Sequence, residues 1–182
     1  MNRLLALVLA VIATGCVATV DTGNKQGAEP DASDDAVIDA AIDAPPDASF
    51  VTACETAGYT AQANLTSLYR RGASATWSAA EAACVADVPG ATHLVVLSSS
   101  AEVDFVKTTL GWVGLSDQAT EGTFVNVTNE ANDLRPFANG QPDNGGGDEN
   151  CVQMKTTAGL DDDQCNKKHA FQCECDGVAA TP

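Results

Sequence analysis

The stretch that decides the fold is Gln141-Pro-Asp-Asn-Gly-Gly-Gly-Asp-Glu-Asn-Cys151, followed shortly by Leu160-Asp-Asp-Asp-Gln-Cys165. Side chains that carry oxygen dominate both segments, and Lys155 is the one basic residue between Gln141 and Cys165. Carboxylates crowded in this way repel one another unless a cation lies between them. Calcium suits such a set because it takes about six to eight oxygen ligands and tolerates irregular geometry. The sequence therefore predicts a calcium site built from loops.

Charge and composition narrow the range of partners. The chain has 182 residues, a formal net charge of −16 and a pI near 4.1. Phosphates of nucleic acid would be repelled by this charge, so we expect no nucleic-acid partner. Electrostatic docking on an anionic membrane is disfavoured for the same reason.

The N-terminus has the pattern of an export signal. A positive start is followed by the apolar run Leu4–Ala13, which is too short for a bilayer that needs about 20 residues and fits a secretory h-region. Ala13-Thr-Gly-Cys16 resembles a bacterial lipobox, although Leu is usual where Ala13 stands. We predict a lipoprotein signal over 1–15 and acylation of Cys16, with ordinary cleavage after Ala18 as the alternative. The protein would then belong to the bacterial cell envelope, as an outer-membrane lipoprotein facing the periplasm or the surface.

The next segment differs in composition from the rest. Residues 16–49 are rich in Asp, Ala and Pro and contain no aromatic residue. Such a segment cannot bury enough apolar surface to offset its ordering entropy. We predict a disordered acidic tether over 16–49, one domain over 50–176 and a disordered tail over 177–182.

Periodicity within the domain predicts both helices and strands. Thr76 begins a helix that carries Trp77, Ala80 and Cys84 on one face, and Ser99-Ser-Ala-Glu102 can cap a second helix that ends at Gly111. Short apolar runs predict strands at 112–115, 151–154 and 171–173. The pattern indicates an α+β fold.

Several ordered motifs carry a resemblance to a known family. They are Trp112-Val-Gly-Leu115, Glu121-Gly-Thr-Phe124, Gln141-Pro-Asp143, Glu149-Asn-Cys151 and Phe171-Gln-Cys-Glu174. In this order and spacing, the chain resembles the C-type lectin-like domain from about Val51 to Asp176. The resemblance implies the C-type lectin fold, in which two helices, short antiparallel sheets and a long loop region are joined by disulfides.

The resemblance also implies a ligand set. The family's calcium ligands correspond here to Gln141 and Asp143, which flank a proline preceded by a cis peptide bond, and to Glu149, Asp161 and Asp162. Gln141, Asp143, Glu149 and Asp161 would also contact a sugar, and the order Gln-Pro-Asp is typical of galactose-type binders. Two positions depart from the family, because Leu160 replaces its Trp and Asp161 replaces its Asn.

Seven cysteines are an odd number, and six remain when Cys16 is set apart. Sequence alone leaves their pairing open. The resemblance implies Cys84 with Cys173 and Cys151 with Cys165, which leaves Cys54 for Cys175. The alternative is a zinc site formed by Cys165, His169, Cys173 and Cys175, but an export signal favours disulfides.

These features predict a calcium-dependent carbohydrate-binding module on a membrane-anchored stalk. The alternative is a C-type lectin-like domain that binds a protein in adhesion, with calcium only shaping its loops. A hydrolase with paired carboxylates is disfavoured because calcium would occupy the best candidates, so we expect no enzyme. His93 lies beside an apolar run without an evident acid–base partner and is given no catalytic role.

Overall fold

The computed structural model describes residues 47–131 and 134–181. The predicted signal, the lipidation site at Cys16 and nearly all of the predicted tether lie outside the described residues. Within the described ranges, no helix combines the length and the apolar character needed to span a membrane.

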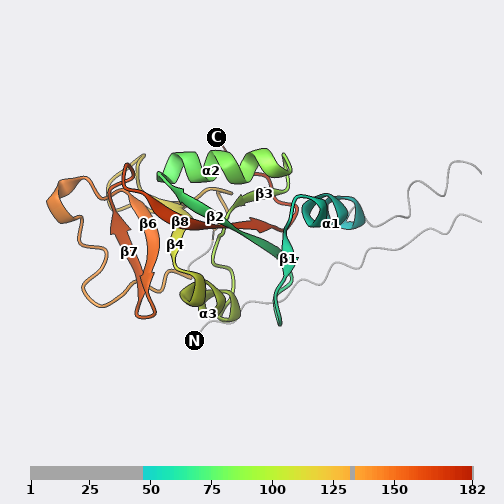
Figure 1. Cartoon of the computed structure of the whole chain (residues 1–182). Coiled ribbons are helices and arrows are strands. Elements are labelled where there is room, and N and C mark those ends of the chain that lie inside the picture. Colours follow the sequence, from blue (N-terminus) through green and yellow to red (C-terminus); the bar gives the residue numbers. More distant parts are fainter. Residues whose placement is uncertain (1–46, 132–133, 182) are drawn as a thin grey trace, which may run out of the picture. The chain divides into compact units, whose positions relative to one another are not determined.

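Strands of the domain form one connected sheet whose order is β1-β2-β8-β4-β6-β7, with β3 paired to β8 and β5 to β4 (Figure 1). All of these pairs are antiparallel except β4 with β8, which is parallel. The strands are β1 (Thr60–Ala61), β2 (Leu68–Ala75), β3 (Thr92–Leu94), β4 (Gly111–Ser116), β5 (Val125–Asn126), β6 (Cys151–Thr156), β7 (Gly159–Asp163) and β8 (His169–Cys175).

Helices α2 (Trp77–Asp87) and α3 (Ser100–Thr109) cover opposite faces of the sheet (Figure 1). Successive side chains of a strand point to opposite faces of the sheet, so the core consists of two apolar clusters, one under each helix. Trp112 packs with the α2 side chains Trp77 and Cys84, whereas its neighbour Val113 packs with Val106 of α3. Both helices agree with the sequence prediction, and the Ser99 side chain caps α3 by accepting the N–H of Glu102 at 3.2 Å.

Three disulfides tie the helices and loops to the sheet. Cys54–Cys175 joins α1 (Asp47–Thr56) to β8, Cys84–Cys173 joins α2 to β8, and Cys151–Cys165 links β6 to the loop after β7. These are the pairings that the resemblance implies. No thiol of Cys165, Cys173 or Cys175 is left to bind zinc, so the zinc alternative is wrong.

The ends of the domain differ from the expectation. Helix α1 begins inside the segment predicted as tether, because its Cys54 is fully buried and Phe50 packs close to Gly177. Residues 177–181, expected as a disordered tail, are held to the domain. The Thr181 N–H and hydroxyl both donate to the carbonyl of Val127, at 2.7 and 2.9 Å.

Candidate metal centre

The β6–β7 hairpin brings the acidic residues of the second segment into a fixed register. Asp162 lies opposite Val152 and Asp161 lies opposite Gln153. Because side chains alternate along a strand, Asp162 projects to one face of the hairpin, and Asp161 and Asp163 project to the other. All three aspartates are buried, at 2–5 % exposure, so each carboxylate needs a partner.

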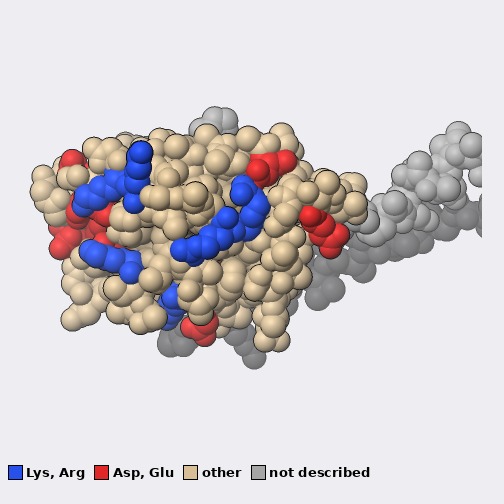
Figure 2. Space-filling view, in the orientation of Figure 1, with Lys and Arg blue, Asp and Glu red and all other residues tan. Residues whose placement is uncertain are grey.

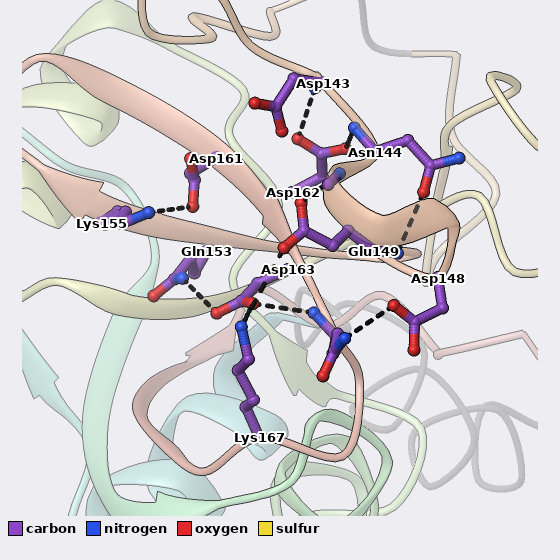
Figure 3. Close-up of polar contacts among 12 residues, drawn as sticks. Asp143, Asn144, Asp148, Glu149, Gln153, Lys155, Asp161, Asp162, Asp163 and Lys167 are labelled. Carbon is purple, nitrogen blue, oxygen red and sulfur yellow. Dashed lines mark hydrogen bonds and ion pairs between the residues drawn. The ribbon is translucent and has the colours of Figure 1, made fainter.

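The loop before β6 folds around the Asp162 side chain. The two Asp162 carboxylate oxygens accept the backbone N–H groups of Asp143 at 3.0 Å and Asn144 at 2.8 Å (Figure 3). The peptide bond between Gln141 and Pro142 is cis, as the resemblance implies. These contacts bring the Gln-Pro-Asp segment next to the hairpin.

A short 3₁₀ turn, η2 (Gly145–Gly147), positions Glu149. Glu149 Oε2 accepts the N–H of Gly145 at 2.7 Å, and the Glu149 N–H donates to Asn144 Oδ1 at 3.2 Å. A Cβ at Gly145 would lie 2.7 Å from Glu149 Oε2, which is closer than a side chain tolerates. Glycine at position 145 therefore leaves room for the Glu149 carboxylate at its present place beside the loop backbone.

Asp143, Glu149 and Asp162 form the acidic cluster of this site. Their carboxylate oxygens lie within 4.8 Å of one another, and exposure decreases from Asp143 through Glu149 to Asp162. Partial burial, together with the negative charges of Asp162, Asp163 and Asp143, raises the pKa of Glu149 above its usual range. Protein groups alone therefore leave this cluster short of positive charge.

Gln141 adds an acceptor without a partner. Its Oε1 is buried and receives no hydrogen bond within the described residues. A buried carbonyl of this kind costs free energy unless a donor or a cation satisfies it. One amide oxygen and three carboxylates are the hard oxygen donors that calcium prefers, so the residues fit that ion.

The structure does not bring Asp161 into this cluster. Its carboxylate accepts a hydrogen bond from Lys155 Nζ at 2.9 Å on the opposite face of the hairpin (Figure 3). The prediction that Asp161 is a calcium and sugar ligand is therefore not supported by its position. The physical reason is the alternation of the strand, which separates Asp161 from Asp162.

Asp163 is an important residue that the sequence reasoning missed. It is bonded by Lys167, by Gln153 Nε2 at 2.8 Å and by His169 Nε2 at 2.9 Å. Burial raises the pKa of Asp163, but the hydrogen bond from Lys167 and its other donors outweigh burial and lower it. Lys167 Nζ also lies 4.0 Å from Glu149 Oε1. Side chains alternate between the two faces of a strand. This alternation along 161–163 was the signal that could have separated Asp162 from Asp161 and Asp163.

The family model described as the lectin C-type domain matches residues 73–175. The chain belongs to the C-type lectin domain family. Its fold, predicted from the resemblance, is confirmed by solved C-type lectin structures.

Known C-type lectin relatives include carbohydrate-binding proteins and others. Lectin BRA-3 of Megabalanus rosa is 33 % identical over 113 residues, which cover 58 % of this chain and 68 % of that protein. The carbohydrate-recognition domain of cow CD23, crystallised in the presence of a GlcNAc2Man3 oligosaccharide, is 27 % identical with a TM-score of 0.57 and covers 68 % of this chain and 99 % of that one. A calcium-independent type II antifreeze protein is 25 % identical with a TM-score of 0.58 and covers 68 % of this chain and 93 % of that one.

A second group of ionisable side chains lies within this C-type lectin domain, between β3 and β8. His93 faces Glu174 across the sheet, and their ligand atoms lie within 4.8 Å of each other and of Asp176. Each is already bonded: His93 Nδ1 to Leu94 O at 2.8 Å, His93 Nε2 to Asp176 Oδ1 at 3.1 Å, and Glu174 Oε2 to the Val96 N–H at 3.0 Å. These contacts give His93 a structural role.

The pKa values in this group are displaced by burial and by neighbouring charge. Burial, together with the charges of Glu102 and Asp176, raises the pKa of Glu174. Burial alone would lower the pKa of His93, but the hydrogen bond and the charge of Asp176 raise it. Glu102 is itself buried and accepts the Tyr69 hydroxyl at 2.6 Å.

Proposed function

We propose that this C-type lectin domain is a calcium-dependent carbohydrate-binding module. The observation that carries the proposal is the cluster of Asp143, Glu149 and Asp162, together with the unpartnered carbonyl of Gln141 two residues before Asp143 in the same loop. Asp161 is omitted from the proposed ligand set, because Lys155 already binds its carboxylate.

Sugar recognition would use the same four side chains. When bound, calcium would supply coordination positions for two neighbouring hydroxyl oxygens of one sugar. Asp143 is the most exposed carboxylate of the cluster and can accept a hydroxyl proton, and the amide group of Gln141 can donate to a sugar oxygen. The order Gln-Pro-Asp supports a galactose-type ligand by resemblance to the family.

Envelope anchoring is a separate part of the proposal and rests on the sequence alone. We propose that acylated Cys16 holds the protein in the bacterial envelope and that the acidic segment 16–49 acts as a stalk. Multiple acyl chains anchor stably, whereas a single chain binds only marginally.

One observation favours the alternative of a protein-binding domain. The pairing of Asp161 with Lys155 removes a polar group from the sugar side, and Leu160 provides only buried apolar contacts. The calcium-independent antifreeze protein demonstrates that this fold also serves without the ion.

A glycan array probed in calcium and again in EDTA separates the two functions. We expect binding to galactose-terminated glycans in calcium, loss of that binding in EDTA, and loss in Asp143→Asn. Asp148→Asn is the matched control, since Asp148 lies on the same loop, is exposed, and is outside the cluster. Absence of any glycan signal, or equal signals with and without chelator, would contradict the lectin function and favour a protein ligand.

A further inference from the structure

A pocket with basic residues in its lining contains none of the residues of the acidic cluster. It encloses ≈ 190 Å³ and is lined by Arg71 of β2, Lys155 of β6 and His169 of β8, with Leu110, Gly111 and Ala170 among its walls. The chain has only 9 Lys and Arg against 25 Asp and Glu, so the convergence of an arginine, a lysine and a histidine from three strands is not expected from composition. Figure 2 shows basic side chains spread across the face of the domain that carries β2.

Arg71 is held in place but keeps most of its donors. Its Nη1 donates to the carbonyl oxygen of Thr109 and, at 3.4 Å, to that of Leu110, at the C-terminal end of α3. A guanidinium has five N–H donors in a planar fork, and in the contacts to Thr109 and Leu110 only Nη1 takes part. The side chain is exposed, which leaves its other N–H groups accessible to a ligand.

Lys155 and His169 are oriented by carboxylates that lie behind them. Lys155 donates to Asp161 at 2.9 Å, yet 59 % of its side chain stays exposed. The His169 ring packs edge-on against Trp112, with 4.6 Å between ring centroids, and its Nε2 contacts Asp163 at 2.9 Å. Asp161 and Asp163 are each only 5 % exposed and do not line the pocket. An approaching ligand therefore meets the Lys155 ammonium and the His169 ring before it meets these carboxylates.

We propose that this pocket binds a single sulfate or carboxylate group of a short acidic saccharide. The planar fork of arginine matches two oxygens of such a group, and a lysine ammonium adds a strong point charge. The volume is below the roughly 300 Å³ at which pockets for larger ligands begin, which suits one charged group and its ring. A long polyanion is disfavoured by the net charge of −16.

Anion binding here does not require calcium, because no residue of the acidic cluster lines the pocket. Lys155 and Asp161 lie on the face of the β6–β7 hairpin opposite to Asp162 and the acidic cluster. The saccharide part of the inference rests on the proposed lectin function, but the anion part rests on the pocket alone. Measurements in EDTA therefore test the pocket even if the calcium site has no sugar ligand.

The test is a titration of the ¹⁵N-labelled protein in EDTA, followed by NMR. The probes are galactose 6-sulfate, galacturonate and neutral galactose, which separate a sulfate from a carboxylate source. We expect saturable shifts of the Arg71 Nε–H signal and of the Lys155 and Ala170 amides with one or both acidic sugars. Neutral galactose is expected to leave these signals unchanged.

Variants test whether the acidic sugars bind in this pocket. Arg71→Gln and Lys155→Gln should each weaken binding about tenfold, the effect of losing one charge-assisted hydrogen bond. Lys107→Gln is the matched control, because it removes one positive charge from α3 outside the pocket. Should Lys155→Gln unfold by leaving Asp161 unpaired, the exposed Arg71→Gln decides alone. No shifts at these signals, equal shifts with galactose, or equal weakening by Lys107→Gln would overturn the proposal.

Discussion

Replacement of Glu149 by Gln should stabilise the calcium-free protein and at the same time reduce its response to calcium. Glu149 belongs to three carboxylates whose oxygens lie within 4.8 Å of one another. Gln keeps the shape of the side chain and an oxygen that can accept the Gly145 N–H, but it removes the negative charge. The two expected effects have opposite signs, so a general loss of stability cannot imitate them.

The magnitude follows from the charges around Glu149. At this separation each carboxylate pair repels by about 0.9 kcal/mol even in a medium as polar as water, and the variant removes two of the three pairs. It also removes the attraction of Lys167, 4.0 Å from Glu149, but this ammonium is exposed to solvent, so its loss offsets only part of that gain. The net gain for the calcium-free variant is about 1 kcal/mol, or about 4 °C in Tm for a domain of this size.

The stabilisation by calcium should be smaller in Glu149→Gln than in the wild type. At a free concentration of about one hundred times Kd, the ion stabilises the native protein by about 2.7 kcal/mol, or about 10 °C. A tenfold weaker site in Glu149→Gln would reduce this stabilisation at the same concentration to about 1.4 kcal/mol, or about 5 °C.

Thermal denaturation across a calcium series, for wild type and both variants, provides the measurement. Asp148→Asn is the control: Asp148 is exposed, and its Oδ1 accepts from Gln164 at 2.7 Å, a contact that Asn can keep. The control should behave as the wild type does. A full calcium shift in Glu149→Gln, or equal losses in both variants, would refute the assignment, because the response would then depend on overall charge.

Two further predictions concern residues outside the acidic cluster. Asp161→Asn should change the calcium Kd in isothermal titration by less than about twofold, and unfolding free energy should fall by about 1 kcal/mol or less, as for a pair with one exposed partner; a tenfold loss of affinity would restore Asp161 to the ligand set. The pKa values of His93 and Glu174 are raised in the folded protein, so the folded protein binds more protons than the unfolded chain. The resulting contribution to the free energy of unfolding is complete at low pH and is lost as the pH rises through the raised pKa values. Unfolding free energy from denaturant titration should therefore fall between pH 6 and pH 9.5, and less steeply in His93→Gln, whereas parallel profiles would contradict the assignment. Glu81, Glu102 and Asp176 also interact electrostatically with this pair, and the lowered pKa of Asp163 affects stability only in acid, below this range.

Local patterns in the sequence were sufficient for much of the fold. The capping sequence Ser99-Ser-Ala-Glu102 predicted the start of α3, and the apolar run around Trp112 predicted β4, because both signals depend on near neighbours. Helix α1 was missed because its stability comes from a distant contact, the disulfide of Cys54 to Cys175, while its first turn has the composition of the preceding acidic segment. Long-range contacts of this kind leave no periodic signal.

The same distinction explains the outcome at the candidate site. Gln141, Asp143, Glu149 and Asp162 could be grouped by resemblance. Whether Asp161 can be a calcium ligand depends on the face of the hairpin to which it projects and on Lys155, the cation six residues earlier in the chain. The number of carboxylates in the sequence does not tell to which face of the hairpin the Asp161 side chain projects.

Alternation along β7 gives the two faces of one hairpin different chemistry. Asp162 joins the cluster that is short of positive charge, whereas Asp161 and Asp163, on the other face, are bonded by Lys155, Lys167 and His169. The replacement of the family's Asn by Asp161 therefore adds no charge to the calcium side. It holds a lysine at the rim of the pocket proposed to bind an acidic sugar. If this reasoning is right, the two faces respond to different additions, calcium on one and an acidic sugar on the other, and each response persists when the other ligand is absent.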